Sequence, residues 1–251
     1  CGRGVKISEA NCRQLGELCA AKDIQLSLHA PYYISMSSVE EEKRLKSVDY
    51  VLQSARAVGA MGGDRIVIHT GSCGKISRET ALELACDTMK KCIAALDAEG
   101  LSHIRMCPET MGKLNQLGTL TEVLALCKLD DRILPCIDFG HLNARTYGGV
   151  DGPGAYAKIF DEMENAIGID RARLFHSHFS KIAYTVPGGE KVHLTFEDTE
   201  FGPDFEPLAE LVAKKNGTPT FICESAGTQA EDAATMERMY AQALAACGQA
   251  E

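Results

Sequence analysis

Short apolar runs alternate along the chain with longer segments in which apolar residues recur at helical spacing. The runs are rich in Ile, Val and Leu, and they predict strands over residues 24–28, 65–68, 104–107, 133–137, 173–175 and 220–223. Strands that are almost continuously apolar are typical of a sheet buried on both faces. The pattern therefore predicts a parallel sheet that is covered by helices.

The segments between these runs carry the signals of helices. Ser38 is a good N-cap with Glu41 as its capping-box partner, and Gly59 closes that helix. The predicted helices cover residues 38–59, 77–100, 119–128, 153–167, 206–216 and 229–246. Strict alternation of strand and helix is typical of the α/β class.

Six strand–helix units are visible, whereas a closed TIM (β/α)8 barrel needs eight units of about 30 residues each. We therefore predict a single TIM-barrel domain over residues 1–251 that lacks its first one to two strands. The chain opens without Met on Cys1-Gly2-Arg3-Gly4, in what we expect to be a loop, which agrees with a truncated N-terminus. An open doubly wound sheet is the alternative, but no strand is followed by a glycine-rich phosphate loop.

Metal-type ligands stand at the ends of the predicted strands, and they are His29, His69, Glu109, Asp138, His176 and Glu224. In a parallel barrel, this end of the strands is where active sites are built. A lone histidine after a strand is usually a structural residue, but six ligand-type residues at equivalent positions predict a metal centre. Histidine nitrogen with carboxylate oxygen suits zinc, manganese or iron.

Composition narrows the function classes. Hydrophobic residues make up 45% and charged residues 24%, as in soluble globular proteins. We expect a cytoplasmic protein, because no apolar run is long enough to span a membrane and no signal peptide is visible. The eleven cysteines are scattered and odd in number, which favours free thiols in a reducing compartment. A net charge of −9 argues against a broad basic surface for nucleic acid, although metals can also carry phosphate binding.

Five motifs together resemble the successive signatures of the endonuclease IV family, the zinc-dependent apurinic/apyrimidinic (AP) endonucleases of DNA repair. They are His29-Ala30-Pro31-Tyr32, His69-Thr70-Gly71-Ser72, Pro108-Glu109-Thr110, Asp138-Phe139-Gly140-His141 and His176-Ser177-His178-Phe179-Ser180-Lys181. The resemblance begins at the family's third strand and extends to Glu224. The wider superfamily of xylose-isomerase-like TIM barrels shares this architecture.

The resemblance implies a zinc site of two to three ions, with Mn²⁺ as the alternative metal. In this site His29 and His69 would bind the first ion, and Glu109 would bridge the first and second ions. The second ion would be completed by Asp138, His176 and Glu224. The bridging Glu109 is the predicted catalytic residue.

The third ion would be bound by His141 and His193, and here the chain departs from the family. The family places an aspartate two residues before the histidine that matches His193, and this chain has Lys191 there. Glu190 or His178 are the alternative ligands. If neither serves, a two-metal site is expected.

The implied reaction is hydrolysis of the phosphodiester 5′ to an abasic site in damaged double-stranded DNA, by a monomer. Tyr32 falls where the family places a residue that enters the damaged DNA, and Tyr33 follows it. The other interpretation is that both tyrosines pack at the barrel mouth. Lys181 is a candidate for contact with a phosphate.

Two other functions stay open at this point. A sugar isomerase or epimerase of the same superfamily would use one divalent metal, with Glu109 and Glu224 moving a proton. The acidic stretch at residues 195–204 and Lys191 favour this alternative. A non-catalytic barrel has no need for convergent ligands. Residues 184–191, with Pro187-Gly188, predict a lid or the tip of a hairpin.

Overall fold

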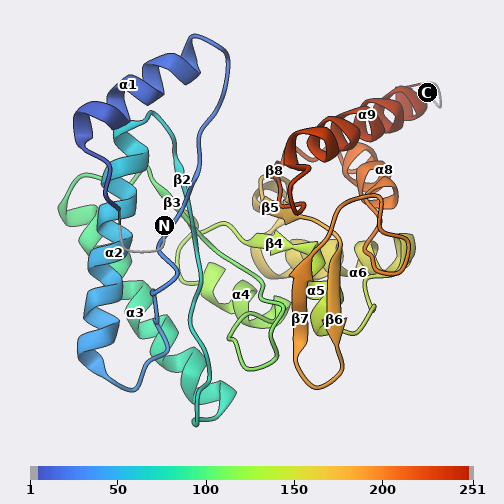
Figure 1. Ribbon diagram of the computed structural model, residues 1–251. Helices are drawn as coiled ribbons and strands as arrows, with labels where there is room; N and C mark the ends of the chain where they lie inside the picture. Colours follow the sequence, from blue (N-terminus) through green and yellow to red (C-terminus); the bar gives the residue numbers. More distant parts are fainter. Residues whose placement is uncertain (1–4, 249–251) are drawn as a thin grey trace. The chain divides into compact units, whose positions relative to one another are not determined.

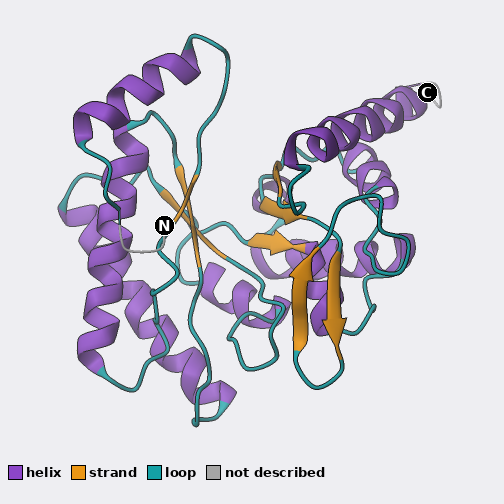
Figure 2. Cartoon of the chain, viewed as in Figure 1, coloured by secondary structure: helices purple, strands orange, loops and turns teal. Residues whose placement is uncertain are grey.

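Six parallel strands form two three-stranded sheets in the computed structural model, which describes residues 5–248 (Figures 1 and 2). The chain divides into two compact units. The first unit holds the described residues up to Glu109, with 115–118 and 125–134, and the second holds 110–114, 119–124 and the residues from Pro135 on. The loop expected at Cys1–Gly4 lies outside the described residues. The expectation that residues 1–251 form a single domain stays a prediction.

The first unit is built on the sheet β1-β2-β3. Its strands are β1 (Leu28–His29), β2 (Arg65–Ile68) and β3 (Arg105–Pro108), and its helices are α1 (Glu9–Ala20), α2 (Glu41–Ala60) and α3 (Arg78–Ala98). All four residues of the central strand β2 are buried. The parallel register pairs Val67 with both His29 and Cys107, so His69 and Glu109 follow their strands at the same level. Helix α4 (Leu120–Cys127) follows β3, and its residues belong partly to each unit.

The second unit is built on the sheet β4-β5-β8. Its strands are β4 (Cys136–Asp138), β5 (His176–Phe179) and β8 (Thr220–Cys223), and an antiparallel hairpin joins β6 (Ile182–Thr185) to β7 (Gly189–His193). Its helices are α5 (Phe139–Arg145), α6 (Gly152–Ile167), α7 (Ile169–Arg173), α8 (Glu206–Lys214) and α9 (Gln229–Gly248). Phe139, Phe175, Phe179, Phe205 and Phe221 form a network of ring contacts with centroids 4.9 to 6.3 Å apart.

The six predicted strands all occur in the predicted order and are parallel, but the fifth is displaced. Residues 173–175 were expected to form it, whereas β5 begins at His176. The reason is the short helix α7, which starts after Gly168 (φ +84°) and takes up Arg173. His176 therefore opens its strand rather than ending it.

Smaller differences concern the ends of elements. β1 covers only the last residue of the predicted run and His29. Helix α2 starts at Glu41 instead of Ser38, because the Ser38 hydroxyl accepts a hydrogen bond from the Glu40 amide (3.1 Å) in the turn before it. The predicted hairpin is confirmed as β6 and β7.

Two expectations from the composition, on disulfide bonds and on membrane-spanning helices, can be compared with the structure. The ten cysteines within residues 5–248 form no disulfide bonds with one another, as predicted. Over the same residues, no helix combines the length and the apolar character needed to cross a membrane.

Candidate metal centre

The first ligand group lies at the carboxyl end of the β1-β2-β3 sheet and consists of His29, His69 and Glu109. One carboxylate oxygen of Glu109, a residue that is 1% exposed, lies 3.2 Å from Nε2 of His29 and 3.0 Å from Nε2 of His69. Nδ1 of His29 donates to the carbonyl oxygen of Ala30 (2.8 Å), which leaves Nε2 as the ligand nitrogen. Two nitrogens and one carboxylate oxygen thus converge as a metal ion requires.

An aromatic shelf flanks this group. Tyr32 and Tyr33 are 59% and 60% exposed, and the Tyr32 ring centroid lies 5.6 Å from that of His69. The two tyrosine rings meet edge to face at 6.3 Å. The residues predicted to contact the substrate therefore present open aromatic surface beside a candidate metal ligand.

The second group belongs to the β4-β5-β8 sheet and contains Asp138, His178 and Glu224. Nδ1 of His178 lies 3.3 Å from a carboxylate oxygen of Glu224. Asp138 is fully buried and also caps α5, because one of its oxygens accepts a hydrogen bond from the His141 amide (2.7 Å). This hydrogen bond to α5 therefore fixes the orientation of the Asp138 carboxylate.

The histidine of this group is His178, whereas His176 was predicted. In the sheet register, His178 is level with Asp138, and His176 is level with Cys136. The displaced start of β5 moves His176 two residues, about 6.6 Å, back along the strand from the ligand level. His176 instead belongs with Cys136 and His178 to a different group of candidate ligands.

The third group consists of His141, Glu190 and His193. Nδ1 of His141 donates to the carbonyl oxygen of Thr110 (2.9 Å), and its Nε2 lies 3.5 Å from the Glu190 carboxylate. Nδ1 of His193 lies 2.8 Å from the Ser180 hydroxyl, which directs its other nitrogen away from this contact. The two imidazole rings meet edge to face at 5.6 Å.

A β-bulge at Lys191 explains why Glu190 is the carboxylate of this group. Ala183 pairs with Val192, but the next residue, Tyr184, pairs with Glu190, so Lys191 is the extra residue on β7. A bulge changes the face to which the neighbouring side chains point. Lys191 is exposed, and Glu190 takes the place of the carboxylate expected two residues before His193.

The tip of the same hairpin is held by a close backbone contact. Gly189 has φ +74°, and the carbonyl oxygen of Gly112 would lie 2.3 Å from a Cβ atom at this position. The Glu190 amide donates to that same carbonyl oxygen (3.3 Å). Only glycine allows this approach, which fixes the hairpin where Glu190 reaches His141.

Lys181, which was predicted to contact a phosphate, is held by the acidic stretch after the hairpin. Its ammonium group donates to the carbonyl oxygen of Asp198 (2.7 Å) and lies 3.0 Å from the Asp204 carboxylate. Both aspartates belong to the acidic stretch at residues 195–204. Lys181 and Asp204 also line a polar cavity of about 330 Å³, together with Asp151 and Glu200.

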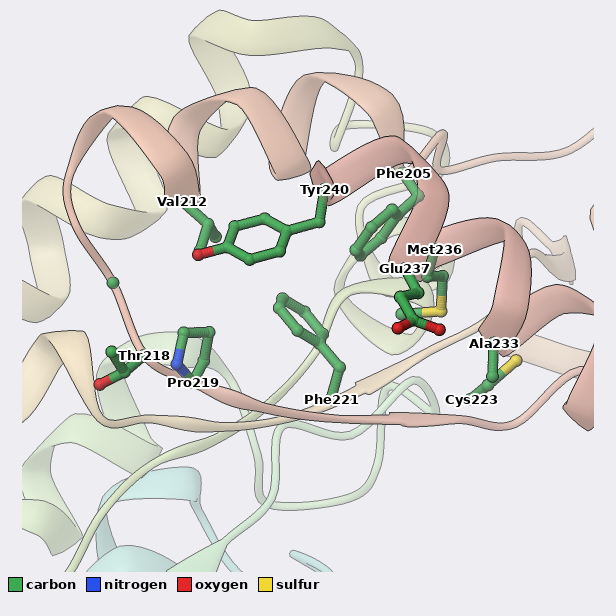
Figure 3. A pocket seen from close by; sticks show the side chains of 11 residues that line it. Phe205, Val212, Thr218, Pro219, Phe221, Cys223, Ala233, Met236, Glu237 and Tyr240 are labelled. Atoms are coloured by element: carbon green, nitrogen blue, oxygen red, sulfur yellow. The ribbon is translucent and has the colours of Figure 1, made fainter. Parts of the chain in front are cut away.

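An apolar cavity of about 460 Å³ lies on the other face of β8, under α8 and α9 (Figure 3). Phe221 and Cys223 of β8 line it together with Tyr240 of α9. Because successive strand residues alternate between faces, Glu224 points to the face opposite that of Cys223. This cavity is therefore separate from the ligand groups of the second unit.

The donor sets fit a transition-metal ion. Each of the three groups supplies imidazole nitrogen and carboxylate oxygen, with ligand atoms within 4.8 Å of one another, and their residues are buried or half-buried. Sets of this kind suit zinc or manganese. The predicted role of Glu109 as a bridging ligand stays a prediction.

Comparison with known sequences identifies the family of this chain and several relatives. The sequence profile of the xylose isomerase-like TIM barrel family matches residues 2–246. An uncharacterized protein of Methanocaldococcus jannaschii is 32% identical over 223 residues, which cover 89% of this chain and 79% of that protein. A probable endonuclease 4 of Acholeplasma laidlawii is 29% identical over 185 residues, which cover 70% of this chain and 59% of that protein.

Solved structures resemble the fold. A D-tagatose 3-epimerase-like protein has a TM-score of 0.73 at 18% identity, and the match covers 96% of this chain and 85% of that protein. Endonuclease IV from Thermus thermophilus has a TM-score of 0.63 at 19% identity, with coverages of 96% and 84%. These likenesses confirm the predicted TIM-barrel fold. Since the family profile extends over nearly the whole chain, the protein belongs to the xylose isomerase-like TIM barrel family.

Proposed function

We propose that this protein is a metal-dependent AP endonuclease, which hydrolyses the phosphodiester 5′ to abasic sites in damaged double-stranded DNA. The observation that carries the proposal is the third ligand group, in which Glu190 replaces the missing carboxylate beside His141 and His193. A sugar epimerase needs one metal ion, whereas three His/carboxylate groups provide for several ions. The names of relatives such as the probable endonuclease 4 of Acholeplasma laidlawii support the same activity.

Zinc bound by these groups would polarise the scissile phosphate and activate water near neutral pH. Hydrogen bonds within the protein already orient the ligand nitrogens of two histidines. His29 and His141 each donate Nδ1–H to a backbone carbonyl, so their Nε2 atoms are held toward Glu109 and Glu190 respectively. Pre-oriented ligands of this kind raise metal affinity.

Tyr32 and Tyr33 supply the surface that would recognise the lesion. The exposed ring of Tyr32 stands beside His69 and that of Tyr33 meets Tyr32, so both rings can stack on bases next to an abasic gap. The protein has a net charge of −9, so we expect bound cations and stacking, rather than a broad basic surface, to hold the DNA.

The test is incision of an end-labelled duplex that contains one abasic site, with zinc- or manganese-loaded protein. We expect a cut immediately 5′ to the lesion, no cut in the matched intact duplex, and loss of incision after treatment with a chelator. The Glu109→Gln variant is the control for a contaminating nuclease. Incision by the wild-type protein that does not exceed that of this variant would refute the proposal.

A sugar isomerase or epimerase is the second candidate, and the polar cavity beside Lys181 favours it. The cation of Lys181 is paired with Asp204, and further carboxylates line the cavity, so its surroundings repel a DNA backbone and suit sugar hydroxyls. Close to one metal ion per chain, with interconversion of ketohexoses and no incision of abasic DNA, would establish this candidate. Two or three ions per chain with incision would exclude it.

A further inference from the structure

We propose that Cys136, His176 and His178 form a separate binding site for a thiophilic transition-metal ion such as zinc, one level deeper in the β4-β5-β8 sheet. The ligand atoms of the three residues lie within 4.8 Å of one another. This site shares His178 with the second ligand group, but it does not rest on the endonuclease proposal, since Cys136 and His176 belong to none of the three groups that support that proposal.

The sheet register builds this site. Cys136 pairs with His176, and two residues further on Asp138 pairs with His178, so the two levels lie about 6.6 Å apart along the strands. His176 and His178 share one face of β5, with ring centroids 5.5 Å apart. The deeper level therefore presents a thiol and an imidazole side by side, with the second imidazole directly above them.

Burial makes these side chains a defined donor set rather than a surface cluster. Cys136 and His176 are fully buried, and His178 is 3% exposed. Sulfur and imidazole nitrogen are the donors that select zinc and copper(I) over magnesium or calcium. On binding, the thiol of Cys136 would lose its proton to solvent, and the resulting thiolate would offset part of the buried cationic charge.

His178 is shared by both levels, which an imidazole ring permits. Its Nδ1 faces Glu224 at 3.3 Å, and the ring has a second nitrogen on its other side. A neutral ring can therefore donate Nδ1–H to the Glu224 carboxylate and bind a metal ion at the thiol level through Nε2. Binding a metal ion at each nitrogen would also require the ring to lose its N–H proton to solvent. We expect the deeper site to persist when Glu224 is replaced.

Cobalt(II) provides the test, because a thiolate ligand gives bound cobalt a charge-transfer band in the near ultraviolet. Of the candidate metal groups within residues 5–248, only this one contains a cysteine. We expect the band in wild-type protein and in Glu224→Gln, its complete loss in Cys136→Ser, and a cobalt content that falls by about one ion per chain in Cys136→Ser. His176→Asn should lose most of the band.

Cys223→Ser is the matched control, since Cys223 belongs to the same sheet but lines the apolar cavity on its other face (Figure 3). This variant should keep the band. A wild-type protein without the band, or a band that survives Cys136→Ser, would overturn the proposal. If Cys136→Ser does not fold, zinc-edge X-ray absorption on the wild-type protein decides instead: one sulfur neighbour at about 2.3 Å supports the site, and none refutes it.

Discussion

The carboxylate of Glu190 lies 3.5 Å from Nε2 of His141, although the residue at the expected ligand position in this hairpin is Lys191. Because the bulge leaves Lys191 unpaired on β7, the Glu190 carboxylate and the His193 imidazole lie in the same ligand group. A ligand spacing that differs by one residue from the family's pattern is thus accommodated by backbone geometry. The number of metal ions that we propose for this protein therefore depends on the bulge at Lys191.

Replacing Glu190 tests this relationship. Glu190→Gln keeps the shape of the side chain but removes its charge, so one metal ion per chain should bind at least about tenfold more weakly. Tenfold is the lower end of the loss in affinity when a residue that only hydrogen-bonds to a metal ligand is replaced. Metal content measured after dialysis against increasing chelator checks the expectation. Lys191→Ala is the matched control and should bind metal as the wild-type protein does. Equal metal contents in both variants would show that Glu190 is not a ligand.

Gly189 should be indispensable for the hairpin tip. Gly189→Ala places a Cβ atom against the Gly112 carbonyl oxygen in a left-handed conformation, which costs about 1–2 kcal/mol for the backbone alone. We expect a lower Tm and a loss of metal affinity like that of Glu190→Gln. Gly188→Ala in the same turn meets only the Thr185 side chain, at 3.2 Å, and should be tolerated. Equal effects of the two changes would contradict the role of the close contact.

The sequence was sufficient for the six parallel strands and for the common level of His69 and Glu109, because each of these two residues directly follows a buried apolar strand. It did not predict that His29 pairs with Val67, two residues before His69, or that His176 lies below the level of Asp138. Arg173-Leu174-Phe175 is apolar enough for a strand, yet Gly168 starts a five-residue helix that periodicity cannot reveal. His178, not His176, consequently reaches the level of Asp138.

The bulge was beyond sequence reasoning for a different reason. Its position depends on how Gly189 meets Gly112, a residue far away in the chain, and no local pattern encodes that contact. Glu190 and His178 were the expected alternatives to a carboxylate at Lys191, and only the strand register selects Glu190. Sites built on hairpins are therefore less predictable than sites at strand ends.

Tyr32 should contribute to the recognition of abasic DNA. Tyr32→Ala removes an exposed ring beside His69, and loss of one stacking contact weakens binding by about 1–3 kcal/mol, or roughly 5- to 150-fold. Fluorescence anisotropy with an abasic duplex at fixed salt measures the change in Kd. Tyr32→Phe should bind normally, and Tyr147→Ala, an exposed tyrosine of the second unit, is the control. An unchanged Kd for Tyr32→Ala would remove Tyr32 from the proposed binding surface.

Asp232 should make the stability of the protein sensitive to acid. Burial alone would raise the pKa of Asp232, but hydrogen bonds from Ser225, the Phe196 amide and Thr228 outweigh burial and lower the pKa. The ionised carboxylate joins α9 to the segment after β7, with distances of 3.0 Å to the Phe196 nitrogen and 2.8 Å to the Thr228 hydroxyl. Its contribution is therefore fully present above the ordinary pKa of about 3.9 and is lost as the pH falls through the lower folded value.

The Asp232→Asn variant isolates this contribution. At neutral pH it should lower the free energy of unfolding by about 1.5–3 kcal/mol, the range for hydrogen bonds to a charged group. The difference from the wild-type protein should shrink below about pH 4, because protonation then weakens the same bonds in the wild type. Urea unfolding at a series of pH values measures both quantities, and Asp49→Asn on the exposed face of α2 is the control. A difference that stays constant down to pH values well below the ordinary pKa would show that the charge of Asp232 does not stabilise the link between α9 and the segment after β7.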